Sequence, residues 1–157
     1  IAGSDEKCSW LTEELGFDAA INYRSQNVAA KLRETCPDGI DVYFDNVGGD
    51  ILEAAIGRLA LRGRVVMCGA ISQYNDSAPS SGPRNLSALI SKRGRLEGFI
   101  VLDYLKRSGE AIQDLATWLA EGRLTFTVDV MDGLDSAPDA LMKLFDGGNT
   151  GKMMVRL

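Results

Sequence analysis

Residues 40–49 have the sequence IDVYFDNVGG, a short apolar run followed by a turn that contains two glycines. The run IDVYF combines β-branched and aromatic residues, which predicts a buried β-strand. After the glycines, apolar side chains recur at helical spacing, at Leu52, Ala55, Ile56 and Leu59. A strand, a glycine turn and an amphipathic helix in this order form the repeating unit of an α/β protein.

The rest of the chain repeats this alternation of β-rich runs and helical periods. We expect strands at 1–3, 19–22, 40–44, 64–68, 96–101, 127–130 and 152–157, and helices at 5–15, 25–36, 50–59, 85–93, 109–121 and 137–145. The stretch 69–84 is rich in Gly, Ser, Asn and Pro, which predicts an exposed loop. The predicted fold is therefore a doubly wound parallel sheet of the Rossmann type, in which ligands bind beyond the carboxyl ends of the strands.

The overall composition excludes several classes of function. The chain has 157 residues, which suits one domain with a full core. Its formal net charge of −5 argues against nucleic-acid binding, because phosphate recognition needs a basic face. No apolar run approaches the roughly 20 residues that span a bilayer, so we expect no membrane partner.

The cysteines and the absence of histidine argue against a metal site. Cys8, Cys36 and Cys68 form no CxxC pair, and the chain contains no His, so we expect no zinc ligands. An odd, scattered set of cysteines fits buried, reduced thiols in a cytoplasmic protein. The sequence starts at Ile1 without a Met, and from this we expect a processed or truncated product.

A first candidate site lies at the junction of strand and helix in the segment Gly3-Ser4-Asp5-Glu6-Lys7. A helix N-terminus favours anions, and a cation in its first turn costs about 0.3–1 kcal/mol. Lys7 stands where a capping box would place Glu, which makes sense if the lysine holds a phosphate. Strand ends that bind NAD commonly offer an acidic residue to the ribose, whereas Gly3-Ser4 leaves room for a 2′-phosphate. The alternative is a plain helix cap with a solvated lysine.

Two further candidates follow predicted strands directly. The segment Asp45-Asn46-Val47-Gly48-Gly49 comes at the end of the first of these strands, where Asn46 offers a donor and an acceptor and the glycines let a backbone approach a ligand closely. Residues 68–75, CGAISQYN, follow the next strand and include Tyr74, whose phenol can donate a proton. The alternatives are a tight turn that needs positive φ at the glycines and a surface loop with one aromatic residue.

Six segments of the chain, in their order, resemble one known family. These segments are AGSDEK, INYR, YFDNVGG, CGAISQYN, EGFIV and GGNTGK. Together they resemble the prostaglandin reductase, leukotriene B4 12-hydroxydehydrogenase and 2-alkenal reductase family, a zinc-independent branch of the medium-chain dehydrogenases and reductases. The resemblance runs over essentially the whole chain, and the pair YFDNVGG and CGAISQYN is its most specific part.

The resemblance implies an NADP(H) site. It implies that Lys7, with Ser4 beside it, holds the 2′-phosphate, and that Tyr23 lies near the adenosine phosphate end. It also implies that Tyr74 is the candidate for handling the proton. The remaining implied cofactor contacts are Asn46, the loop Cys68, Gly69, Ala70, Ile71 and Ser72 around the nicotinamide half, the pocket residues Phe99, Ile100 and Val101, and Asn149.

The implied reaction is hydride transfer from NADPH to the β-carbon of an α,β-unsaturated ketone or aldehyde, followed by protonation of the α-carbon. Two alternatives stay open: an NADPH quinone reductase of the same fold, and a non-catalytic nucleotide-binding or scaffold module. The retention of Lys7, Asn46 and Tyr74 together speaks against the second of these.

This sequence departs from the family pattern at its start. In the family, the domain opens with a strand and a Gly-rich turn for the pyrophosphate, and a GroES-like substrate domain precedes it. We therefore expect residues 1–157 to be a partial dinucleotide-binding domain, incomplete at its N-terminal end and inactive alone. The strand at 40–44 would then present an unpaired edge. We expect an ordered form to cover that edge by pairing within the chain or with a second copy, as a homodimer or larger assembly.

Overall fold

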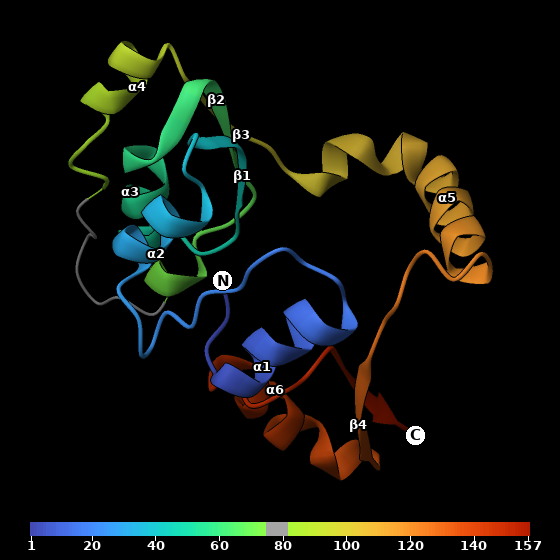
Figure 1. The fold of residues 1–157 in the computed structure, drawn as a ribbon. Helices are drawn as coiled ribbons and strands as arrows, with labels where there is room; N and C mark the ends of the chain where they lie inside the picture. Colours follow the sequence, from blue (N-terminus) through green and yellow to red (C-terminus); the bar gives the residue numbers. More distant parts are fainter. Residues whose placement is uncertain (75–81) are drawn as a thin grey trace. The chain divides into compact units, whose positions relative to one another are not determined.

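A computed structural model describes residues 1–74 and 82–157, so that 75–81 of the predicted loop lie outside the described residues. The chain divides into two compact units (Figure 1): Ile21–Lys106, and Ile1–Ala20 together with Arg107–Leu157. Each unit contains a parallel sheet and helices. The predicted α/β class of Rossmann type is therefore confirmed.

The unit Ile21–Lys106 contains a three-stranded parallel sheet in the order β1-β2-β3. Its strands are β1 (Ile40–Asp45), β2 (Leu59–Met67) and β3 (Arg95–Gly98), and its helices are α2 (Val28–Thr35), α3 (Gly49–Gly57) and α4 (Ser87–Lys92). The unit of strand, glycine turn and helix predicted around residues 40–59 is thus present, with α3 joining β1 to β2.

One face of this sheet carries the core of the unit. Tyr43, Val65 and Leu96 are adjacent in the strand register, and they pack with the apolar faces of the helices. Figure 1 shows α2 and α3 on the same side of the strands. The buried residues are Ile21, Leu32, Ile40, Leu52, Ala55, Ile56, Leu59 and Val65. This core fixes the carboxyl ends of β1 and β2, where the candidate site begins.

The opposite face of β1 is open, and β1 is an edge strand. Val42 and Phe44 alternate with the core side chains, and they are 51% and 55% exposed. Among residues 1–74 and 82–157, β1 pairs only with β2. The expected exposed edge is therefore present. No second strand among the described residues pairs with β1 along that edge.

The second unit contains a two-stranded parallel sheet of β4 (Val128–Asp132) and β5 (Lys152–Arg156). Its helices are α1 (Asp5–Ser9), which continues as a π-helix at Trp10–Glu14, α5 (Ser108–Ala120) and α6 (Ala137–Phe145).

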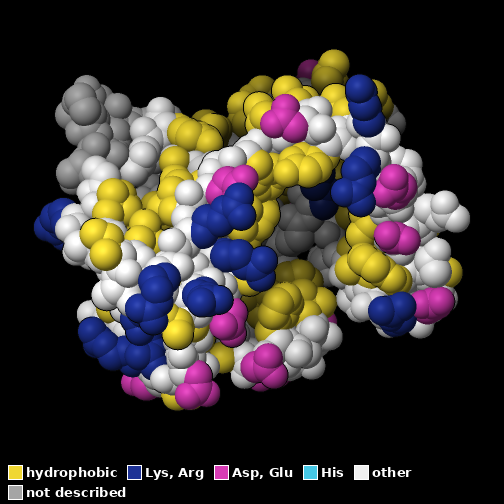
Figure 2. Space-filling view, turned by 90° about the horizontal axis from the view of Figure 1, so that it is seen from above, with side chains coloured by type: hydrophobic (Ala, Val, Ile, Leu, Met, Phe, Trp, Pro, Cys, Tyr) yellow, Lys and Arg dark blue, Asp and Glu magenta, His cyan; other side chains and the backbone are white. Residues whose placement is uncertain are grey.

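Exposed hydrophobic side chains are visible at the molecular surface as yellow areas between charged ones (Figure 2). Among residues 1–74 and 82–157, no helix combines the length and the hydropathy that a membrane span requires.

Several predicted strand boundaries are wrong. Segments 1–3 and 19–22 form only single bridge residues, at Ala2 and Asn22, because no described strand extends a ladder along them. β2 begins at Leu59, earlier than predicted, because the residues before position 64 form a bulge with Arg62 at φ 63°. β3 ends at Gly98 because its partner β2 already ends at Met67.

We predict that the 157-residue chain self-associates in solution, because an unpaired parallel edge beside an open apolar face favours pairing with a second copy. Light scattering over a range of concentrations measures the mass. We expect a mass above one chain for the wild type and a lower mass for Val42→Lys, which puts a charge on the open face beside the edge. Leu61→Lys, at a similarly exposed position in the bulge of β2, serves as the control. A monomer at every concentration would contradict the prediction.

Candidate functional site

The loops that follow β1 and β2 are bonded to each other at the carboxyl edge of the sheet. The amide of Ile71 donates to the carbonyl of Asn46 at 3.1 Å. The amide and the hydroxyl of Ser72 both donate to the carbonyl of Val47, at 3.1 and 2.5 Å. The two predicted candidates at 46–49 and 68–74 therefore form a single structure, which we call the paired loops.

Glycines allow this close pairing. Gly48 has φ +73°, and a Cβ there would lie 3.3 Å from the Cβ of Ala70. A Cβ on Gly69 would lie 3.1 Å from the Tyr74 hydroxyl and 3.4 Å from the Asn46 carbonyl. The sequence left two explanations for these glycines, a close approach to a ligand and a tight turn that needs positive φ. The positive φ is confirmed for the turn before α3.

Tyr74 lies at the end of the second loop and folds back over it. Its hydroxyl oxygen accepts a hydrogen bond from the amide of Ala70 at 3.2 Å, across a short 3₁₀ turn at Ile71–Gln73. The side chain is 66% exposed. Because the oxygen is used here as an acceptor, the phenolic proton is left to donate to another group. Tyr74 is therefore held in place and can act as a proton donor.

The predicted pocket strand at 99–101 is irregular in the structure. The amide of Phe99 still donates to the carbonyl of Met67 at 3.1 Å, but Val101 already begins a 3₁₀ helix at Val101–Arg107. The Phe99 ring makes edge contacts with Phe44 and Tyr104, with ring centroids 5.9 and 5.8 Å apart. Ile100 and Val101, the other two predicted pocket residues, are exposed.

Lys7 and the turn that carries Asn149 meet in the other unit. Ser4 caps α1, and its hydroxyl accepts from the amide of Lys7 at 3.2 Å. The Lys7 ammonium donates to the carbonyl of Gly147 at 2.6 Å. Asn149 closes the same turn with a bond from its amide to the carbonyl of Gly151 at 2.8 Å. An ammonium has three donors, so Lys7 keeps two for a phosphate.

Tyr23 belongs to the unit Ile21–Lys106 and takes part in none of the hydrogen bonds described for Lys7 and Asn149. Its ring is half-exposed, and the guanidinium of Arg24 lies over it at 5.9 Å from the centroid. The amide of Arg24 donates to the side chain of Asn22 at 3.0 Å, which fixes the turn. A flat aromatic face beside a cation suits the adenosine phosphate end of a nucleotide.

Asp45 belongs to the candidate site, although within the segment Asp45–Gly49 only Asn46 and the glycines were expected to act there. Its side chain is fully buried, and its carboxylate accepts from the amides of Val47 and Gly48 and from the hydroxyl of Tyr43. Burial, and then the nearby charge of Asp45, raise the pKa of Tyr43, so its hydroxyl stays protonated. An Asp before a glycine turn is the sequence signal for such a bonded turn.

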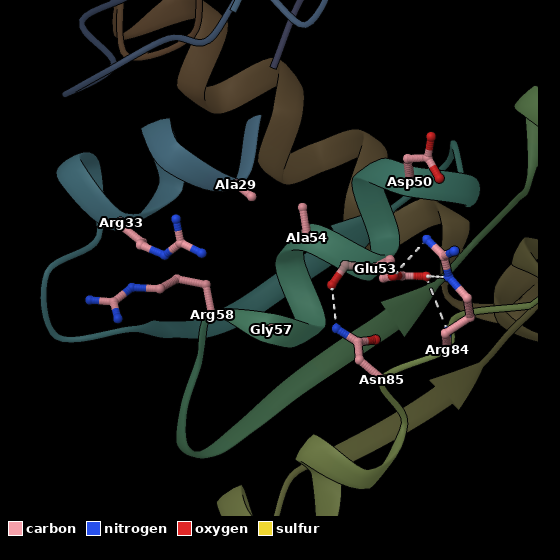
Figure 3. A pocket seen from close by; sticks show the side chains of 9 residues that line it. All are labelled: Ala29, Arg33, Asp50, Glu53, Ala54, Gly57, Arg58, Arg84 and Asn85. Atoms are coloured by element: carbon pink, nitrogen blue, oxygen red, sulfur yellow. Dashed lines mark hydrogen bonds and ion pairs between the residues drawn. The ribbon is translucent and has the colours of Figure 1, made fainter. Parts of the chain in front are cut away.

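A hollow of about 380 Å³ lies elsewhere, on the outer side of α2 and α3 (Figure 3). Glu53 accepts from the amide and guanidinium of Arg84 at 3.1–3.4 Å, and its carbonyl accepts from Asn85 at 2.8 Å. These bonds attach the segment before α4 to α3. The hollow contains none of the residues predicted for cofactor binding. Among its polar residues, Glu53 binds Arg84 and Asn85, whereas Arg58 binds the carbonyls of Cys36 and Pro37.

Clusters suited to a metal ion are missing from the described ranges 1–74 and 82–157. No group of three or more His, Cys, Asp or Glu side chains in those ranges is arranged to hold a cation. The expectation that the cysteines are buried is wrong: Cys8 and Cys36 are half-buried and Cys68 is exposed, all as free thiols. Cys68 is exposed because it follows the last residue of β2, where the chain enters the loop.

Comparisons with known proteins match this architecture. The chain is 44% identical to 2-alkenal reductase (NADP(+)-dependent) of Nicotiana tabacum, over 98% of the chain and 45% of the relative. It is 41% identical to (+)-pulegone reductase of Mentha piperita, again over 98% of the chain and 45% of the relative. The solved complex of CurA with NADPH from Vibrio vulnificus superposes with a TM-score of 0.90 at 40% identity, covering 99% of this chain and 48% of that one.

The chain thus spans about half the length of the curated relatives that it matches. The family model described as zinc-binding dehydrogenase matches residues 15–155. That match covers all of the unit Ile21–Lys106, with the paired loops, and the other unit from residue 15 to residue 155. The chain therefore belongs to the zinc-binding dehydrogenase family, among the medium-chain dehydrogenases and reductases.

Proposed function

We propose that the chain is the cofactor-binding part of an NADPH-dependent reductase of activated C=C bonds in α,β-unsaturated ketones and aldehydes. The observation that carries the proposal is the paired loops, which present Asn46 and Tyr74 together at the carboxyl edge of the sheet. In parallel α/β sheets this edge is where cofactors and substrates bind. The similarity to an NADP(+)-dependent 2-alkenal reductase and to (+)-pulegone reductase supports the same reaction class.

In this proposal, two groups of residues hold NADP(H). Ser4 and Lys7 bind the 2′-phosphate, and Asn149 closes over the cofactor from the turn that Lys7 contacts. Tyr23 lies at the adenosine end, while Asn46 and the loop 68–74 surround the nicotinamide half. Phe99, Ile100 and Val101 complete the pocket. When bound, the cofactor supplies the hydride, and the protein orients the reacting groups.

Tyr74 has the remaining chemical task. Reduction at the β-carbon leaves an enolate, whose oxygen needs a hydrogen-bond donor and whose α-carbon needs a proton. The Tyr74 hydroxyl is anchored through its oxygen by the Ala70 amide, so its own proton can point to the substrate. We further propose that a GroES-like domain outside these 157 residues supplies the substrate pocket, in line with the length of the relatives.

Turnover assays on the intact protein test the proposal. NADPH oxidation is followed with an enone, an enal and a quinone at matched concentrations. We expect turnover with the enone and the enal, with the saturated ketone or aldehyde as product. Faster turnover with the quinone would favour a quinone reductase, and the binding of NADPH without turnover of any substrate would favour a non-catalytic nucleotide-binding module.

A further inference from the structure

The Asp45 side chain is fully buried, which is rare for an aspartate in a globular protein. Its exposure is 0%, and no ion pair in the described part of the chain joins it to a lysine or arginine. Burying a charge without a cation is costly unless hydrogen bonds replace its water. Here the replacement is supplied by the amides of Val47 and Gly48 and by the hydroxyl of Tyr43, at 3.0–3.2 Å.

These bonds fix the conformation of the turn between β1 and α3. The amides of Val47 and Gly48 turn inward to the carboxylate, which leaves the carbonyls of Asn46 and Val47 to accept from the second loop. Those carbonyls bind the amides of Ile71 and Ser72. The inward direction of the amides in the first loop therefore leaves its carbonyl oxygens facing the amides of the second loop.

The backbone of Asp45 makes a second link between the loops. Its carbonyl accepts from the amides of Cys68 and Gly69, at 2.8 and 3.1 Å, where the chain leaves β2. Beyond this point, the Ala70 amide binds the Tyr74 hydroxyl. These hydrogen bonds, with the backbone between Gly69 and Ala70, thus link Asp45 to Tyr74, while Asn46 is its neighbour in the chain.

We propose that Asp45 is a positioning residue for the reductase site: its buried carboxylate fixes the turn after β1, against which the second loop pairs, and thereby fixes Asn46 and Tyr74 relative to each other. This inference rests on the proposed function for its catalytic consequence, but not for its structural one. Asp45 touches neither substrate nor cofactor in this scheme, and it acts through the two loops. Tyr43 contributes as a neutral donor to the same carboxylate.

Asp45→Asn in the intact protein tests the inference. The amide keeps one oxygen acceptor and puts an N–H group where the second carboxylate oxygen accepts from Gly48. We expect the Kd for NADPH to rise about tenfold, with a further fall in kcat for the enone. Hydrogen exchange followed by mass spectrometry should become faster at 46–48 and at 69–74, and stay unchanged in α4 and β3. Tyr43→Phe removes one donor and should show the same pattern more weakly.

Ile56→Val is the matched control. Ile56 is fully buried in α3, like Asp45 in β1, but it is not among the hydrogen-bond partners of the carboxylate. It should lower stability without changing the NADPH Kd or exchange in the loops. If Asp45→Asn behaves like Ile56→Val, or leaves exchange in both loops unchanged, the inference is wrong. If the wild-type protein does not bind NADPH, the proposed function fails, and the exchange measurement alone still decides whether Asp45 positions the loops.

Discussion

Replacing Tyr74 by phenylalanine should lower kcat for enone reduction about 100-fold, the lower end of what a positioned proton donor contributes. The Kd for NADPH should rise much less, because the aromatic ring remains. The expected split follows from the geometry: the hydroxyl oxygen accepts from Ala70, and the hydroxyl proton is the part that phenylalanine removes from the reaction. Steady-state kinetics with an enone and a fluorescence titration with NADPH measure the two quantities separately.

The same substitution also removes a hydrogen bond within the loop, so a second variant is needed to separate the two effects. Ser72→Ala removes the bond from the Ser72 hydroxyl to the Val47 carbonyl and leaves the phenol in place. It should cost far less in kcat than Tyr74→Phe does. Similar losses in both variants, or unchanged turnover in Tyr74→Phe, would mean that Tyr74 only packs against the loop.

Replacing Lys7 by alanine should raise the Kd for NADPH about 10–100-fold, because each charge-assisted bond to a phosphate contributes about 1.5–3 kcal/mol. The Kd for NADH should change little, because NADH has no 2′-phosphate. This expectation rests on the position of the Lys7 ammonium in the first turn of α1, beside the small Gly3-Ser4 pair. Two of its donors are left after its bond to Gly147. Titrations with both cofactors give the ratio directly.

Lys7→Arg provides the control for the contact with the turn at Gly147. It keeps a positive charge and several donors, so it should retain most of the preference for NADPH. If Lys7→Ala weakens NADPH and NADH equally, the lysine supports the turn that carries Asn149 and does not recognise the phosphate.

The central part of the fold could be predicted from the sequence, because its signals are local. IDVYF forms β1, the stripe of Leu52, Ala55 and Ile56 is buried in α3, and the strand at 64–67 follows. Each of these elements has apolar periodicity and glycine punctuation that need no knowledge of distant residues. The positive φ of Gly48 and the exposed edge of β1 follow from the same local arguments.

The features that were missed depend on partners distant in the sequence. β3 ends at Gly98, because the chain after Met67 bonds to Asp45 and no longer to β3. The bulge in β2 depends on Gly63, where a Cβ would lie 2.6 Å from the carbonyl of Ile40. Asp45 looks like an ordinary turn residue until its burial is seen, and its role appears only when both loops are placed together.

The most direct test of the central claim is to follow the hydride itself. The intact protein is given NADPH that carries deuterium at the transferable C4 position, together with an α,β-unsaturated ketone, and the product is analysed by NMR. The proposal predicts a saturated ketone with deuterium at the β-carbon and a solvent proton at the α-carbon. An allylic alcohol with deuterium at its carbinol carbon, the former carbonyl carbon, would contradict it, because the protein would then be a carbonyl reductase.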